Sequence, residues 1–194
     1  MKNLIAETRA ATPEDAAALA ELIDLAGEGL PLYLWERMAE PGETAWDVGR
    51  RRARRESGAF SYRNAVVAER HGQTAGCLVT YGIGSERQVI DPHDTPAMFV
   101  PLLELENLAL ASWYVNVLAV YPSFRSQGVG TQLLKVASDQ ARAHGSLGES
   151  IIVSDANSGA YRLYERCGFR RKAERAMVKE GWKNPGRNWV LLVK

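Results

Sequence analysis

The sequence predicts an α/β protein (α+β, with a mixed sheet) in which helices pack on the sheet. Two β-rich runs around His71-Gly72-Gln73 indicate a hairpin. Two later β-rich apolar runs are each followed by an amphipathic helical stretch. In chain order these segments lie at 64–70, 74–81, 113–120, 128–144, 151–153 and 157–167. A hairpin followed by alternating strands and helices is typical of a mixed sheet covered by helices.

The remaining elements follow from local signals. Thr12 has the position of an N-cap, Pro13 that of a first helical residue, and Gly27 that of a helix end. The other expected elements are a strand at 2–9, a helix at 43–56, a loop at 82–101, a helix or strand at 101–110, and strands at 169–178 and 189–193. Because no linker or repeat interrupts them, residues 1–194 are expected to form a single domain.

Composition excludes several functional classes. The chain is 46% apolar and 24% charged, which is ordinary for a globular protein. A net charge of +1 gives no general attraction to nucleic acid or to an anionic membrane, so neither is expected as a partner. Cys77 and Cys167 form no disulfide framework or metal motif. Without an apolar leader or a membrane-length apolar run, a cytoplasmic location is expected.

The most informative stretch joins the strand at 113–120 to the helix that follows it. A helix start offers unpaired N–H groups and positive dipole charge, and therefore suits an anion. Gly128 and Gly130 would let a phosphate approach the backbone, and Arg125 adds a charge. One alternative is an ordinary glycine-containing loop. A dinucleotide fingerprint is disfavoured because Leu133 replaces its third glycine, and no P-loop motif occurs.

A second informative stretch runs from 157 to 169. Asn157 can cap a helix whose face includes Ala160 and Tyr164. Gly168 stands where a left-handed residue ends a helix, and Phe169 can fold back as its apolar partner.

Together these stretches resemble the GNAT superfamily of acetyl-CoA-dependent N-acetyltransferases. Arg125-x-x-Gly128-x-Gly130 resembles its Q/R-x-x-G-x-G/A signature, and 157–169 resembles its N-x-x-A-x-x-L-Y-x-x-x-G-F motif. The resemblance implies a mixed sheet of six or seven strands with splayed central strands and about four flanking helices. It implies acetyl-CoA as co-substrate, without a metal. The residues it implies for CoA are Leu118, Ala119, Val120, Arg125, Ser126, Gln127, Gly128, Val129, Gly130, Thr131, Asn157 and Tyr164.

The implied reaction moves an acetyl group to a primary amine of a small molecule or peptide. Tyr164 is the predicted acid for the departing thiolate, and Glu106 the predicted base. Some family members have a glutamate where this chain has Ile152. Glu106 is ranked over Glu104 because it lies nearer the strand. The other candidates for the base are water relayed through Asn116 or Tyr114, and His93.

Two further interpretations stay open. The chain could be a CoA-binding regulatory module that has lost catalysis, because no base is evident from a motif. The run 179–187 could form a wall of the acceptor site or a homodimer contact.

Arginines are concentrated between residues 50 and 55. Five of these six residues are arginine. One interpretation is a solvated helix face, paired as Asp47–Arg51 and Arg52–Glu56. The other is a site for a phosphate or an acidic substrate.

Overall fold

The computed structural model describes residues 6–91 and 93–194 and divides into two compact units. Unit 1 contains the chain up to Thr80 together with Asn116–Val136, and unit 2 contains Tyr81–Val115 and Ala137–Lys194. Strand β4 (Trp113–Val120) and helix α5 (Val129–Ala143) each contribute residues to both units. The expectation that 1–194 is a single domain stays a prediction.

Seven strands form one mixed sheet in the order β1-β2-β3-β4-β5-β7-β6. In addition to β4, they are β1 (Glu7–Ala10), β2 (Ala65–Arg70), β3 (Gln73–Gly82), β5 (Glu149–Ser154), β6 (Arg170–Ala176) and β7 (Asn188–Val193). Strands β1, β2 and β3 pair antiparallel, as do β5, β7 and β6. Parallel pairing with β5 involves Trp113–Val115, the first three residues of β4. The predicted mixed sheet is therefore confirmed. Of the strand expected at 2–9, residues 2–5 lie outside the described residues.

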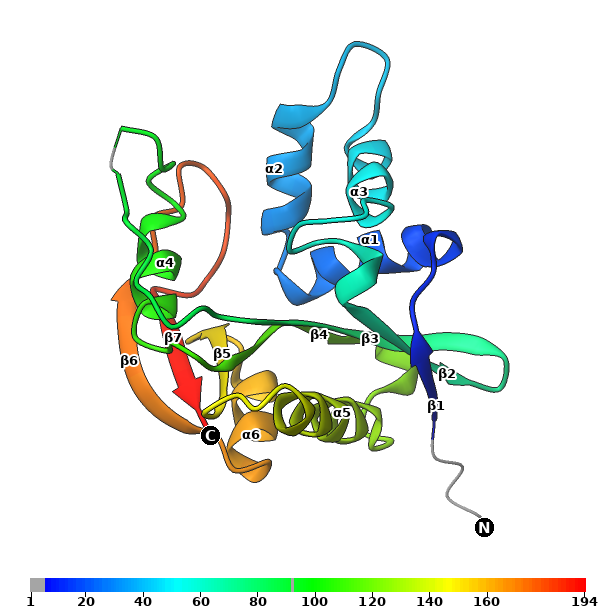
Figure 1. Cartoon of the computed structure of the whole chain (residues 1–194). Coiled ribbons are helices and arrows are strands. Elements are labelled where there is room, and N and C mark those ends of the chain that lie inside the picture. Colours follow the sequence, from blue (N-terminus) through cyan, green and yellow to red (C-terminus); the bar gives the residue numbers. More distant parts are fainter. Residues whose placement is uncertain (1–5, 92) are drawn as a thin grey trace. The chain divides into compact units, whose positions relative to one another are not determined.

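Helices α1 (Ala16–Ala26), α2 (Leu30–Met38) and α3 (Ala45–Ala53) belong to unit 1 and gather on one face of β1–β3 (Figure 1). Their apolar faces form a core with Leu19, Leu22 and Val67, each no more than 1% exposed. Helix α3 approaches α2 closely, since a Cβ at Gly49 would lie 2.5 Å from the ring of Trp35. Trp35 is accordingly a core residue.

Helix α3 is shorter than the predicted helix at 43–56, and its ion pairs differ from those expected. Thr44 caps it, and Asp47 accepts from the Thr44 amide at 3.0 Å. Because Asp47 is held by this hydrogen bond, its carboxylate forms an ion pair with Arg50 at 2.7 Å and not with Arg51. Glu56 lies beyond the helix end, so helical spacing does not apply to it. It pairs with Arg63 at 2.6 Å instead of Arg52.

In unit 2, helices α4 (Val100–Glu106) and α6 (Ser158–Arg166) accompany strands β5–β7 (Figure 1). The stretch 101–110, which fitted a helix or a strand, thus contributes a short helix. One core cluster of this unit contains Leu105 and Leu191, both 0% exposed, together with Tyr114. Within the described parts of the chain, no helix has the length and apolar character that crossing a membrane requires.

Candidate active site

The turn between β4 and α5 has the geometry of an anion site. A 3-10 turn at Pro122–Phe124 leads into it, and Ser126 and Gly128 take left-handed φ values of 59° and 85°. The first amide of α5 with a backbone acceptor is that of Gln132, which donates to Gly128 at 3.0 Å. For the amides of Ser126–Thr131, no backbone acceptor occurs among the described residues. This stretch can therefore offer several N–H groups to a phosphate.

The side chains of the turn lie at its edges. The Arg125 Nε donates to the carbonyl oxygen of Val120 at 3.1 Å, which holds this guanidinium beside the end of β4. Gln127 donates to the Ser123 carbonyl at 2.9 Å and accepts from Arg70. Val129 is buried and begins the helix, whereas Gly128 is exposed. The predicted phosphate-binding residues thus form a continuous surface turn.

The second motif folds as predicted. The side chain of Asn157 accepts from the Ala160 amide at 3.1 Å and caps α6. Gly168 has φ 96°, and Phe169 is fully buried behind it. Tyr164 is 4% exposed, and its ring lies 6.1 Å from that of Phe169. Helix α6 therefore holds Tyr164 in one orientation.

Glu106 ends α4 among tyrosines of neighbouring strands. The rings of Tyr81 and Tyr114 lie 5.4 Å apart in an edge-on contact. Burial raises the pKa of Glu106 to about 7. Burial also raises the pKa of Tyr114, and the charges of Glu106 and Tyr164 raise it further. The charges of both predicted catalytic residues, Glu106 and Tyr164, therefore act on the same tyrosine of unit 2.

We refer to Glu106, Tyr114, Tyr164 and Tyr81 as the acid–base cluster. The sequence interpretation missed Tyr81. It is the second-last residue of strand β3, where no motif marks it. Burial raises its pKa first of all, and the charge of Glu106 raises it in addition. The sequence signal for Tyr81 was its place near the end of a strand in the predicted hairpin. That signal alone did not predict the contact between Tyr81 and Tyr114, which depends on the order of the strands in the sheet.

The rival bases are less suited to the role. Glu104 forms an ion pair with Arg175 at 2.5 Å, so its charge is already compensated. His93 lies exposed in a loop, and its amide donates to Asp91. The Nδ2 atom of Asn116 is buried, and it has no hydrogen-bond partner among the residues that the structure describes. No group of metal-ligating side chains that could hold an ion occurs in 6–91 or 93–194.

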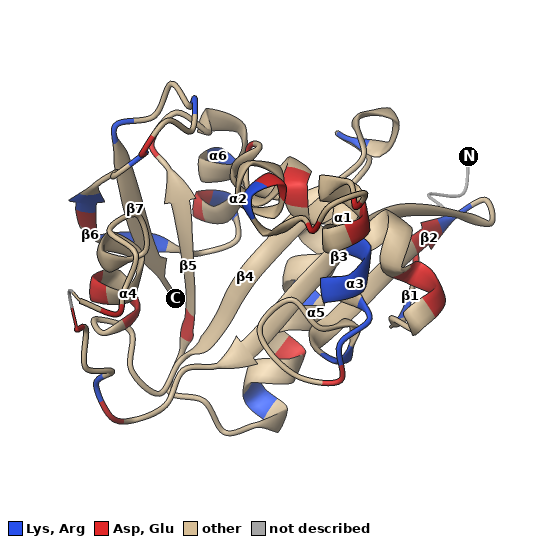
Figure 2. Ribbon diagram, turned by 90° about the horizontal axis from the view of Figure 1, so that it is seen from above, with Lys and Arg blue, Asp and Glu red and all other residues tan. Residues whose placement is uncertain are grey.

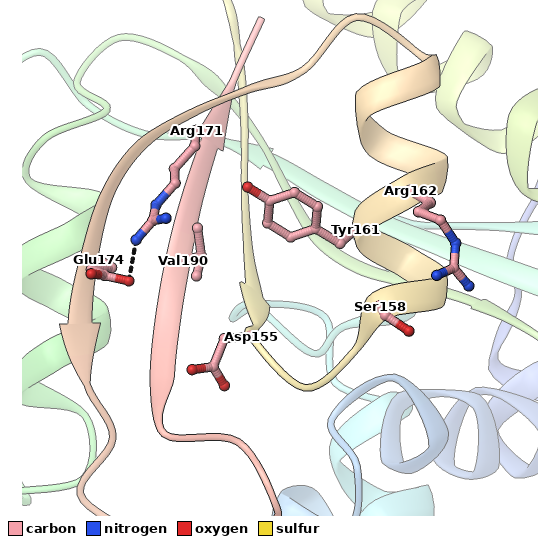
Figure 3. Close-up of a pocket in the computed structure, with 7 residues that line it drawn as sticks. All are labelled: Asp155, Ser158, Tyr161, Arg162, Arg171, Glu174 and Val190. Atoms are coloured by element: carbon pink, nitrogen blue, oxygen red, sulfur yellow. Dashed lines mark ion pairs between the residues drawn. The ribbon is translucent and has the colours of Figure 1, made fainter.

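A separate pocket of unit 2 lies on another face of α6. It has a volume of about 410 Å³ and is lined by Asp155, Ser158, Tyr161, Arg162, Arg171, Glu174 and Val190. Figure 3 shows Tyr161 pointing from α6 toward β7, with the Arg171–Glu174 ion pair on β6 beyond it. Tyr164 does not line this pocket, so the acid–base cluster and the pocket are distinct.

The arginines of α3 make this helix the basic segment of unit 1 (Figure 2). Arg50 and Arg51 are engaged by Asp47 and Glu43. Arg52 lies over the ring of Phe60 at 5.8 Å, and burial lowers its pKa. Arg50 and Arg51 thus fit a solvated, paired helix face, whereas Arg52 is half-buried and does not belong to it.

The chain thus combines a mixed sheet, a turn between β4 and α5 that can offer N–H groups to an anion, and a buried Glu106 carboxyl. The profile of the acetyltransferase (GNAT) family matches residues 31–169. The chain therefore belongs to the GNAT acetyltransferase family and is an acyltransferase by family. A comparison with curated proteins finds no match.

Solved structures share the fold. One acetyltransferase crystal structure is 23% identical, with a TM-score of 0.65, and covers 97% of this chain and 98% of its own. An N-acetyltransferase from Staphylococcus aureus Mu50 is 17% identical, with a TM-score of 0.63 and coverages of 97% and 100%. A GNAT family acetyltransferase from Elizabethkingia anophelis with acetyl-CoA bound is 20% identical, with a TM-score of 0.53 and coverages of 89% and 87%. At these identities the similarity shows the fold.

Proposed function

We propose that this protein transfers the acetyl group of acetyl-CoA to a primary amine of a small molecule or peptide. The observation that supports this best is in unit 2, where Glu106 is buried with a raised pKa and the charges of Glu106 and Tyr164 both raise the pKa of Tyr114. Transfer to an amine needs one group that takes a proton from nitrogen and another that gives one to sulfur. A carboxyl and a phenol in the same unit, Glu106 and Tyr164, are candidates for that pair.

The amine must lose a proton before it can attack. An alkylamine with a pKa near 10.4 pays about 4 kcal/mol to become neutral at pH 7.5. With a pKa of about 7, Glu106 is a stronger base than an exposed carboxylate and is still ionised above neutral pH. It takes one proton from the ammonium group and later releases it to water.

The nitrogen lone pair then forms the C–N bond with the thioester carbon, and the C–S bond breaks. The Tyr164 hydroxyl gives its proton to the departing sulfur, and the resulting phenolate takes the remaining excess proton from nitrogen. The products are an amide and a free thiol. An oxyanion at the carbonyl needs a nearby donor, for which a backbone N–H near Val120 is the candidate.

The turn residues fit the diphosphate of acetyl-CoA. The amides of Ser126–Thr131 supply donors, Gly128 is open above its backbone, and Arg125 supplies a charge at the edge. Leu118, Ala119 and Val120 are assigned to the pantetheine arm, as is Asn157 at the start of α6. A cytoplasmic location and the absence of nucleic-acid or membrane partners belong to the same proposal, and the net charge of +1 supports the absence of such partners.

Thiol release from acetyl-CoA tests the proposal. The panel contains monoamines, amino acids, polyamines, aminoglycosides and peptides, and mass spectrometry identifies the acetylated product. Turnover with at least one amine, at a rate that rises with pH through about 7, is expected. Binding of acetyl-CoA without turnover of any amine would instead favour a regulatory CoA-binding module.

A further inference from the structure

Within unit 1, the hairpin of β2 and β3 ends beside residues 125–131, the turn between β4 and α5 that is proposed to bind the phosphates. Its two-residue turn, His71-Gly72, has φ values of 53° and 71°, the left-handed pair of a type I′ turn. Arg70 pairs with Gln73 directly before this turn. The tight turn therefore gives Arg70 a defined position at the end of β2.

A bulge directs this end of the hairpin toward the chain that follows β4. The pairing steps from Ala68–Gly76 to Glu69–Thr74, which leaves Ala75 as the extra residue. The carbonyl of Ala75 accepts from the Tyr121 amide at 2.9 Å. The hairpin is thus hydrogen-bonded to the first residue after β4.

The approach of β3 to β4 is also close at the next residue. A Cβ at Gly76 would lie 2.4 Å from the carbonyl oxygen of Ala119, so only glycine fits there without a shift. The hairpin and the start of the turn are therefore fixed to one another by the backbone.

Arg70 extends this connection into the turn. Its Nη1 donates to Oε1 of Gln127 at 2.5 Å, across 57 positions of sequence. The other end of the same amide, Nε2, donates to the Ser123 carbonyl at 2.9 Å. Gln127 therefore links the hairpin to the segment that opens the turn.

The turn needs such support. Ser126 is a non-glycine residue at φ 59°, a conformation that costs roughly 1–3 kcal/mol and persists only where surrounding contacts impose it. Gln127 is the next residue, and both ends of its side-chain amide are engaged. These hydrogen bonds hold the chain beside Ser126, where the stretch of amides without a backbone acceptor begins.

We propose that Arg70 is a positioning residue for the acetyl donor: through Gln127 it holds the turn 125–131 in the conformation that presents its amides to the phosphates. This inference rests on the proposed function. Arg70 acts through another side chain, so its loss should weaken binding of acetyl-CoA and leave the chemical step intact.

The test is a double-mutant cycle with Arg70→Met and Gln127→Met, read out by calorimetry with acetyl-CoA. Each single variant should bind about 3- to 10-fold more weakly, and the double variant about as weakly as one single variant. In steady-state assays the loss should appear in KM for acetyl-CoA and spare kcat. Arg63→Met is the matched control, since it removes a unit 1 arginine that pairs with Glu56, and it should bind normally.

Three results would overturn the inference: normal affinity in Gln127→Met, additive losses in the double variant, or an equal loss in Arg63→Met. If Arg70→Met still weakened binding, the first result would mean that Arg70 acts independently of Gln127. Failure of the proposed function looks different, because wild-type protein would then bind acetyl-CoA without acetylating any amine, or would not bind it at all. Melting curves confirm that each variant is folded.

Discussion

Replacing Glu106 by glutamine tests both the proposed base and its surroundings. The substitution keeps the shape of the side chain and removes its ability to take a proton. At pH 8 the acetylation rate should fall by roughly 10²–10⁴, because general base catalysis is lost. The affinity for acetyl-CoA should stay unchanged. The rise of the wild-type rate with pH through about 7 should also disappear.

The same variant makes a prediction about stability. Burial raises the Glu106 pKa from 4.5 to about 7, so the folded protein holds this proton more tightly than the unfolded chain does. Ionisation therefore costs stability as pH rises from about 4.5 to about 7, a difference of roughly 3 kcal/mol above both values. Glutamine stays neutral and avoids this cost. Glu106→Gln should thus be more stable than wild type at pH 8, by up to about 3 kcal/mol, and nearly equal to it at pH 4.5.

Urea unfolding at the two pH values measures this difference. Glu104→Gln is the matched control, because Glu104 occupies the same helix but pairs with Arg175. It should show a near-normal rate and no gain in stability at pH 8. The reasoning is refuted if Glu106→Gln is as active as wild type, or if it is destabilised at pH 8 as much as at pH 4.5.

Three further predictions concern the turn, the acid and the sheet. Gly130→Val should reduce acetyl-CoA binding at least about 10-fold in calorimetry, because a branched side chain would hold the phosphates away from the amides; unchanged affinity in the folded variant would remove the phosphate-turn assignment. Tyr164→Phe should lower kcat and kcat/KM together by roughly 10- to 10³-fold with a normal melting curve; full activity would make Tyr164 a packing residue. Gly76→Ala should destabilise the protein by roughly 1–3 kcal/mol in urea unfolding, since its Cβ would lie 2.4 Å from the Ala119 carbonyl oxygen; wild-type stability would contradict the close approach.

Local signals predicted the elements that depend on local chemistry. The His71-Gly72 turn was predictable because glycine tolerates left-handed φ values, and the hairpin followed from it. Asn157 and Gly168 mark the two ends of α6 for similar reasons, as cap and as left-handed terminator. The order of the two motifs then indicated the family.

Signals that depend on neighbours distant in sequence were weaker. The ion pairs of α3 were predicted from helical spacing, but Asp47 also caps the helix, and Arg51 instead pairs with Glu43. The choice of Glu106 over Glu104 rested on proximity to a strand. The structure supplies a physical reason for it, because Arg175 neutralises Glu104 and burial leaves Glu106 with a raised pKa.

The sequence by itself determined the mixed sheet, the two motifs and the turn between β4 and α5, because backbone preferences and glycine positions are local properties. Only the tertiary structure decided that Tyr81 contacts Tyr114, that the charge of Glu106 acts on Tyr81, and that Arg70 reaches Gln127 across 57 positions. The proton affinity of a carboxyl and the shape of a strained turn depend on what surrounds them. Those surroundings come from strand order and a bulge, which no local pattern encodes.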